Sequence, residues 1–132
     1  EFLEVIESVG AAVVGDNVCF GTRSFQELIP EAGEPFETLC RSTFYNVPCS
    51  RMIGGFPQRY ENVRRQLNHA KADGVIFQRI KFCDPWGAEA HNMMHRYRNS
   101  AGHLLVLERE YGVTAAGQVK TRVQAFLEAM GK

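Results

Sequence analysis

The sequence predicts an α/β fold in which helices cover both faces of a parallel sheet. Short apolar runs of strand length alternate along the chain with longer segments whose apolar residues recur every three or four positions. Strands that alternate with helices favour a parallel sheet that is covered on both faces. The length of 132 residues, with 45% hydrophobic and 23% charged residues, suits one compact domain with a core of its own.

The N-terminal part of the chain predicts one helix, one strand and a long irregular segment. A helical period of apolar residues over 1–9 ends at Gly10, and the apolar residues that follow predict a short buried strand over 11–15. Three prolines and a Gly-Gly pair predict that residues 16–55 are irregular, apart from a short helix over 24–29. Long irregular segments in compact domains are often functional.

The C-terminal part alternates regularly between helices and strands. Helices are expected over 57–72, 86–100 and 115–130, and strands are expected over 74–79 and 103–108. Pro57 suits the start of the first of these helices, and Gly74 closes it. Thr114 is a suitable cap for the last helix. This alternation is the main reason for expecting a parallel sheet.

A helical pattern at the very start of the sequence bears on the sheet. The pattern is already present at Glu1, so we read the sequence as a piece of a longer protein. We expect a three-layer, flavodoxin-like sheet whose first strand is missing from this piece. The first strand is central in a doubly wound sheet, and its loss leaves unpaired edges that recruit other chains. Closure of the gap or strand exchange between chains is therefore expected.

Charge and composition exclude several classes of function. The 15 basic and 15 acidic residues cancel, so neither nucleic acid nor an anionic membrane is expected as the main partner. No apolar run approaches the roughly 20 residues that span a bilayer, and no signal peptide is expected. The four cysteines form no C-x-x-C pair, so a zinc ribbon is not expected. Reduced thiols in a cytoplasmic protein are the simplest interpretation.

Charged residues and cysteines follow the ends of the expected strands. Three segments do so: Asp16–Arg23, Lys81–Pro85 and Glu108–Tyr111. Ligands of open α/β sheets bind beyond the carboxyl ends of the strands. We therefore expect these three segments to meet at one edge of the sheet and to form the functional site.

Cys83 is the candidate with the most specific position, between a strand and a helix. The positive end of a helix stabilises a thiolate, which suits metal ligation or nucleophilic attack. A buried structural cysteine is equally compatible with this position. Because an iron–sulfur cluster usually takes four ligands, a cluster on Cys83 would need ligands from outside this sequence.

The other candidate residues have simpler interpretations. Cys19, Cys40 and Cys49 are interpreted as ordinary small residues, with Cys49 the least certain of the three. His91 and His95 have the i, i+4 spacing of a metal pair, but Asn92 stands where a zincin has its glutamate. We expect a solvated helix face there. A second charged face is expected at Arg59, Arg64 and Arg65.

Several motifs resemble the subunits of 2-hydroxyacyl-CoA dehydratases and benzoyl-CoA reductases (the 2-hydroxyglutaryl-CoA dehydratase D-component family). The Lys-Phe-Cys-Asp segment at 81–84 matches that family fully. Further matches in order along the chain are Asp16, Cys19, Gly21 and Arg23; Pro48-Cys49-Ser50-Arg51, with serine for a second proline; Glu108, Glu110 and Tyr111; and Gly117, Gln118, Thr121, Arg122, Ala125, Phe126 and Glu128. Each motif alone is weak, but together they cover the chain almost end to end. The resemblance implies that residues 1–132 are the C-terminal α/β domain of a longer multidomain subunit.

The resemblance also implies a cofactor and a chemistry. Active subunits of the family hold a 4Fe–4S cluster through three cysteines, and the one that carries over to this sequence is Cys83. The other two belong to parts of the subunit outside this sequence, so the isolated domain is expected to carry no cluster and to be inactive. Asp84 and Arg23 are the candidate catalytic residues. Asp84 would tune the cluster ligand by hydrogen bonds, and Arg23 would either bind a carboxylate or CoA phosphate or brace its loop.

The implied reaction belongs to anaerobic metabolism. An ATP-hydrolysing iron–sulfur activator protein supplies one electron, and the (R)-2-hydroxyacyl-CoA substrate becomes a ketyl radical anion that expels its hydroxyl group. The implied partners are the acyl-CoA thioester, a paralogous companion subunit and the activator, with neither nucleic acid nor membrane. Two alternatives stay open: a subunit of ATP-dependent benzoyl-CoA reductase, which reduces the aromatic ring, and a non-catalytic subunit-contact or CoA-binding module.

Overall fold

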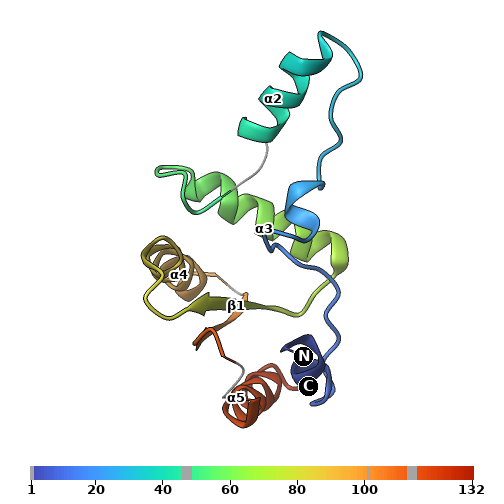
Figure 1. Ribbon diagram of the computed structural model, residues 1–132. Coiled ribbons are helices and arrows are strands. Elements are labelled where there is room, and N and C mark those ends of the chain that lie inside the picture. The colour runs from blue at the N-terminus through green and yellow to red at the C-terminus, as the bar shows by residue number, and fades with distance from the viewer. Residues whose placement is uncertain (1, 46–48, 101, 113–115) are drawn as a thin grey trace. The chain divides into compact units, whose positions relative to one another are not determined.

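The structure is a computed structural model that describes residues 2–45, 49–100, 102–112 and 116–132 (Figure 1). The chain divides into two compact units. Unit 1 takes in residues 1–14 and 67–132, and unit 2 takes in residues 15–66. Each unit is described by itself.

Unit 1 contains a parallel sheet and most of the helices. Its elements are α1 (Phe2–Glu7), β1 (Gly74–Ile80), α4 (Asp84–Arg98), β2 (His103–Arg109) and α5 (Ala116–Ala129). Strands β1 and β2 pair in parallel, with Phe77 opposite Val106 in the register. The α/β class, these two strands and the three C-terminal helices were predicted from the apolar pattern, and the structure confirms them to within two residues at each end.

Helices cover opposite faces of this two-stranded sheet. Ile76 and Leu107 pack into a cluster with Ile6 of α1 and Val123 of α5. On the other face, the ring of Phe77 lies 5.7 Å from that of Trp86 in α4, measured between centroids. Neighbouring residues of a strand point to opposite faces, so α4 lies on one side of the sheet and α1 and α5 lie on the other (Figure 1).

The expected strand over 11–15 is wrong in this structure, because these residues have no regular secondary structure. Ala11 packs against the core cluster, but Val14 is exposed. A short apolar run forms a strand only where another strand offers it backbone partners. The described sheet therefore has two strands, and a flavodoxin-like order of further strands stays a prediction.

Two residues with positive φ end helices. Gly10, at φ +93°, follows α1 as the sequence predicted. The helix α3 (Phe56–Ala70), whose last turn enters unit 1, is closed by Lys71 at φ +50°, and the N–H of Ala72 donates to the carbonyl of Leu67 at 3.0 Å. This is the left-handed ending that commonly terminates helices. The prediction that Gly74 closes this helix is therefore wrong.

Gly74 instead permits close packing between β1 and α5. A Cβ atom at this position would lie 2.8 Å from Cζ of Phe126 and 3.1 Å from Sδ of Met130. It would also lie 3.2 Å from the carbonyl oxygen of His103. Only a residue without a side chain fits at the start of β1 without moving these neighbours.

Unit 2 contains a 3-10 turn η1 (Thr22–Ser24), the helix α2 (Pro35–Tyr45) and most of α3. The short helix expected over 24–29 is thus a single turn further towards the N-terminus. The sequence interpretation missed α2, because it treated Pro35 as a breaker. Pro35 is instead the first helical residue, a position that suits proline. A carboxylate oxygen of Glu34 accepts a hydrogen bond from the N–H of Glu37 at 2.8 Å and so caps this helix.

Arg59 of α3 binds the backbone of the loop that precedes this helix. Its side chain is buried, and Nη1 donates to the carbonyl oxygens of Cys49 and Met52, each at 2.9 Å. The expected exposed face is therefore wrong for Arg59. It holds for Arg64 and Arg65, which are exposed and pair with Glu61 and Glu27.

Two expectations fall on residues outside the described ranges: the helix cap at Thr114 and the Pro48 position of the Pro-Cys-Ser-Arg segment. Among the residues that the structure does describe, no helix combines the length and the apolar character needed to cross a membrane.

Candidate functional site

Cys83 lies in unit 1 at the junction between β1 and α4, as the sequence predicted. It is the N-cap residue of α4, with an extended backbone at φ −88° and ψ 96°. Its N–H donates to the carbonyl of Ile80 at 3.2 Å, and its own carbonyl accepts from the N–H of Gly87 at 2.8 Å. The thiol is free and half-buried. A thiolate here would lie at the positive end of a 15-residue helix.

The residue before Cys83 has an unusual backbone. Phe82 has φ +64°, and its side chain is 91% exposed. A bulky residue in the left-handed region costs of order 1–2 kcal/mol, and an exposed ring recovers little of that cost by burial. The ammonium group of Lys81 lies 5.8 Å from the centroid of the ring. This sharp turn brings the chain from β1 into α4 and fixes the position of Cys83 between them.

Two of the three predicted segments meet at the carboxyl end of the sheet. The N–H of Lys81 donates to the carbonyl of Arg109 at 2.8 Å, which continues the pairing of β1 with β2 beyond the last strand residue. Ion pairs join Arg79 to Glu108 and Lys81 to Glu110, the second at 3.3 Å. The structure therefore confirms that the Lys-Phe-Cys-Asp segment and the segment after β2 lie side by side.

Asp84, a candidate catalytic residue, is the first residue of α4 and is exposed. Its side chain makes no hydrogen bond or ion pair with another described residue. Its position suits a carboxylate, because a negative charge in the first turn of a helix is stabilised by the helix dipole. The proposed tuning of Cys83 through hydrogen bonds from Asp84 stays a prediction.

The third predicted segment, Asp16–Arg23, belongs to unit 2. Asp16 organises it into a compact loop: a carboxylate oxygen accepts from the N–H groups of Val18 at 3.2 Å and Thr22 at 3.0 Å. The Thr22 hydroxyl donates back to the carbonyl of Asp16 at 2.5 Å. Gly21 lies so close to this carboxylate that an added Cβ would overlap it. The hydrogen bonds and close contacts within the loop therefore account for the Asp, Gly and Thr residues at these positions.

Arg23 and Cys19 form a pair inside that loop. Arg23 is only 5% exposed, and its Nη2 donates to Sγ of Cys19 at 2.7 Å. Of the two roles expected for Arg23, bracing the loop is the one that this contact supports. Cys19 itself is exposed.

Among the described residues, no group of three or more histidines, cysteines, aspartates and glutamates is placed to hold a metal ion. His91 and His95 are exposed on α4, which agrees with the solvated face expected for them. A metal group bound to Cys83 would therefore need further ligands from outside the described residues.

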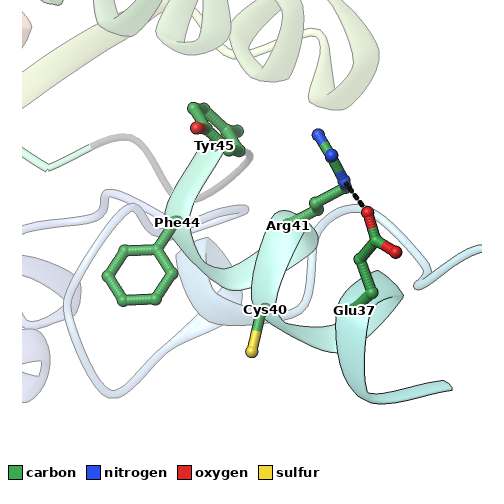
Figure 2. Close-up of a pocket in the computed structure, with 5 residues that line it drawn as sticks. All are labelled: Glu37, Cys40, Arg41, Phe44 and Tyr45. Carbon is green, nitrogen blue, oxygen red and sulfur yellow. Dashed lines mark hydrogen bonds and ion pairs between the residues drawn. The ribbon is translucent and has the colours of Figure 1, made fainter. Parts of the chain in front are cut away.

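A shallow hollow of about 270 Å³ lies on α2, away from Cys83 in the sequence (Figure 2). It is lined by Glu37, Cys40, Arg41, Phe44 and Tyr45, all from this one helix. Arg41 and Glu37 form an ion pair at 2.9 Å across one side of it. A single helix cannot enclose a small molecule, so we do not assign this hollow as a substrate site.

Known proteins similar to this chain are dehydratase subunits. Over 130 residues it is 28% identical to the (R)-phenyllactyl-CoA dehydratase beta subunit of Clostridium sporogenes, with 98% of this chain and 34% of that protein covered. It is 24% identical over 129 residues to the putative dehydratase subunit YjiM of Escherichia coli (strain K12), with 97% and 33% covered. It is 22% identical over 131 residues to the lactoyl-CoA dehydratase subunit beta of Anaerotignum propionicum, with 98% and 35% covered.

The chain thus spans about a third of the length of the curated relatives that it matches. The model of the 2-hydroxyglutaryl-CoA dehydratase D-component family matches residues 1–130, which is nearly the whole chain. This match agrees with the motifs found in the sequence. Those at Cys83 and Glu108 lie in the two segments at the end of the sheet, and the motif at Asp16 lies in the loop of unit 2. The chain belongs to the 2-hydroxyglutaryl-CoA dehydratase D-component family.

Proposed function

We propose that this chain is the Cys83-bearing α/β domain of a subunit of a 2-hydroxyacyl-CoA dehydratase. The whole subunit would remove water from an (R)-2-hydroxyacyl-CoA thioester in the cytoplasm. Two of the relatives are named for phenyllactyl-CoA and lactoyl-CoA, whose acyl groups both carry a hydroxyl next to the thioester carbonyl. That shared chemistry supports a 2-hydroxyacyl-CoA as the substrate class of this protein.

The observation that carries the proposal is the position of Cys83. It combines a free, half-buried thiol, the N-terminal end of α4 and two backbone hydrogen bonds made by Cys83 itself. These are the properties of a thiolate ligand, which must be deprotonated and held in place. We infer that Cys83 is one cysteine ligand of a 4Fe–4S cluster, whose other cysteines lie in parts of the subunit outside this sequence.

The remaining residues at this edge would hold the ligand in place. The ion pairs Arg79–Glu108 and Lys81–Glu110 tie the strand before Cys83 to β2. Asp84 would set the polarity next to the ligand. When bound, a cluster with an open iron site supplies Lewis acidity and low-potential electron transfer. The dehydration would run through a ketyl radical after one electron arrives from an ATP-hydrolysing activator.

Assembly is part of the proposal. Because the relatives are named as beta subunits, we infer a companion subunit for this protein as well. Reduction of benzoyl-CoA by an ATP-dependent reductase is the alternative chemistry for the same type of site. The non-catalytic alternative, a subunit-contact or CoA-binding module, keeps the fold and the interfaces but needs no ligand at Cys83.

An anaerobic activity assay of the whole subunit tests the function. The subunit that contains this chain would be purified with its companion, supplied with the activator and ATP, and given (R)-lactoyl-CoA, (R)-phenyllactyl-CoA or benzoyl-CoA. We expect formation of the 2-enoyl-CoA from one of the 2-hydroxyacyl thioesters and none in the Cys83→Ala variant. The Cys40→Ala variant should retain its activity, because Cys40 lies in α2 and belongs to none of the family motifs.

Two results would contradict the proposed function. Reduction of benzoyl-CoA without dehydration would assign the protein to the reductases. Full dehydratase activity in the Cys83→Ala variant would leave the fold and family intact but remove Cys83 from the reaction.

A further inference from the structure

Helix α5 carries the last family motif of the sequence, which the proposed chemistry leaves without a role. Phe126 of this motif packs against the start of β1, where a Cβ atom on Gly74 would lie 2.8 Å from its Cζ. Arg122 of the same motif reaches the second strand, where its Nη2 donates to the carbonyl oxygen of Val106 at 2.8 Å. Arg122 therefore joins α5 to the backbone of the sheet.

The carbonyl of Val106 lies on the edge of β2 that faces away from β1. The N–H of Lys81 donates to the carbonyl of Arg109, so Arg109 points its carbonyl towards the first strand. The N–H and C=O of one strand residue point to the same edge, and those of the next residue point to the opposite edge. Val106 therefore points outward, as do Leu104 and Glu108. The backbone groups of these three residues form the outer edge of β2.

Arg122 binds the outer edge of β2 at its centre. Val106 is the middle residue of the strand His103–Arg109, so the guanidinium group lies in the middle of the row that an added strand would have to follow. An unpaired strand edge readily pairs with another chain, and charged side chains at the edge are one way in which proteins prevent this. A strand added here would have to displace Arg122 from the Val106 carbonyl.

The core holds Arg122 in this position. Val119 and Val123 of α5 are buried in the core cluster together with Leu107 of β2. Val123 is the neighbour of Arg122 in the helix, and Leu107 is the neighbour of Val106 in the strand. Adjacent residues thus make the packing contact and the edge contact on both elements, so the packing fixes the place from which the arginine side chain extends.

We propose that Arg122 closes the outer edge of β2 and prevents this edge from pairing with the same edge of a second copy of the chain. Strand β2 is then the last strand on its side of the sheet, and any further strand joins at the edge of β1 that faces away from β2. The inference uses only the contacts of α5 with β2 in unit 1, so it does not depend on the proposed function.

Lys120 provides the matched control for Arg122. Both residues are exposed on α5, so Arg122→Ala and Lys120→Ala each remove one positive charge from the surface of the same helix. Of the two residues, Arg122 is the one with a described bond to β2. Arg122→Lys keeps a charged donor at the position and should keep the edge closed. Thermal melting of each variant shows whether the fold is intact.

Amide exchange of the unmodified full-length subunit tests whether β2 ends the sheet. Mass spectrometry with fragmentation to single residues would follow the N–H groups of the strand. Those of Leu105 and Leu107 point towards β1 and should exchange slowly. Those of Leu104, Val106 and Glu108 should exchange at least about tenfold faster, because no strand bonds to them. Slow exchange at these three positions would show that another strand pairs with β2, which would overturn the proposal.

Sedimentation velocity of the variant subunits over a range of concentrations tests the role of Arg122. We expect Arg122→Ala to associate with itself at a concentration at least about tenfold lower than the unmodified subunit does, with new exchange protection at the outer edge of β2. Lys120→Ala and Arg122→Lys should behave like the unmodified subunit.

Three results of the sedimentation experiment would contradict the assigned role. If Arg122→Ala associates no more than the unmodified subunit, the edge does not need the arginine. Equal association of Lys120→Ala would make the cause a loss of charge rather than an opened edge. A lower melting temperature of Arg122→Ala without any association would show that Arg122 only braces α5 against the sheet.

Discussion

Single residues in the family motifs have different physical roles. In the loop of unit 2, Asp16 binds two backbone N–H groups, and Gly21 leaves room for that carboxylate. In unit 1, Phe82 adopts a left-handed backbone that turns the chain towards Cys83. The first group builds a loop, whereas the second positions a thiol. A motif match alone does not distinguish these roles, because a motif gives only the type of residue at each position and not what that residue contacts.

Gly21 gives a direct test of the loop geometry. Replacing it by alanine would drive a Cβ atom into the Asp16 carboxylate and break hydrogen bonds to Val18 and Thr22. We expect the Gly21→Ala variant to lose roughly 1–3 kcal/mol in free energy of unfolding. Gly15→Ala is the matched control, because a Cβ there meets nothing within 4 Å. Urea unfolding of both variants measures the difference, and equal stabilities would refute the loop geometry.

At the scale of elements, success and failure of the predictions have physical causes. The strands at 74–80 and 103–109 were predictable because each apolar run pairs with the other over seven residues. Residues 11–14 have a similar apolar pattern. They would form a strand only beside a partner strand, and the local sequence does not show whether such a partner is present. Helix α2 was missed although its signals were present: a proline at its first position and apolar residues at 36, 39, 40 and 44.

Arg59 shows how an element can be organised by a buried charge that sequence patterns do not reveal. Its guanidinium group holds the carbonyls of Cys49 and Met52, so Arg59→Leu would leave these groups without that donor. We expect a loss of about 1–3 kcal/mol in free energy of unfolding and faster proteolysis at Arg51. Arg64→Leu, on the exposed side of the same helix, should change stability by less than about 0.5 kcal/mol. Equal effects in both variants would remove the assigned role of Arg59.

At the scale of the whole molecule, the candidate site could be predicted only in part. The edge formed by Lys81–Asp84 and Glu108–Glu110 followed from the parallel order of β1 and β2, because their carboxyl ends must be neighbours. The loop at Asp16–Arg23 belongs to the other unit, so its expected place at the same edge stays a prediction. That expectation depended on a strand over 11–15, which the structure does not contain. The proposed cluster would take its ligands other than Cys83 from outside this sequence, so the sequence alone could not predict them.

Iron content of the full-length subunit tests the central claim most directly. The subunit would be purified anaerobically as the unmodified protein and as four single variants: Cys19→Ala, Cys40→Ala, Cys49→Ala and Cys83→Ala. Thiolates anchor iron–sulfur clusters and alanine offers no donor atom, so we predict that Cys83→Ala alone loses most of its iron and its iron–sulfur absorbance. Full iron in the Cys83→Ala subunit, or loss of iron in the Cys19→Ala or Cys49→Ala subunit instead, would contradict the assignment of Cys83 as the ligand from this chain.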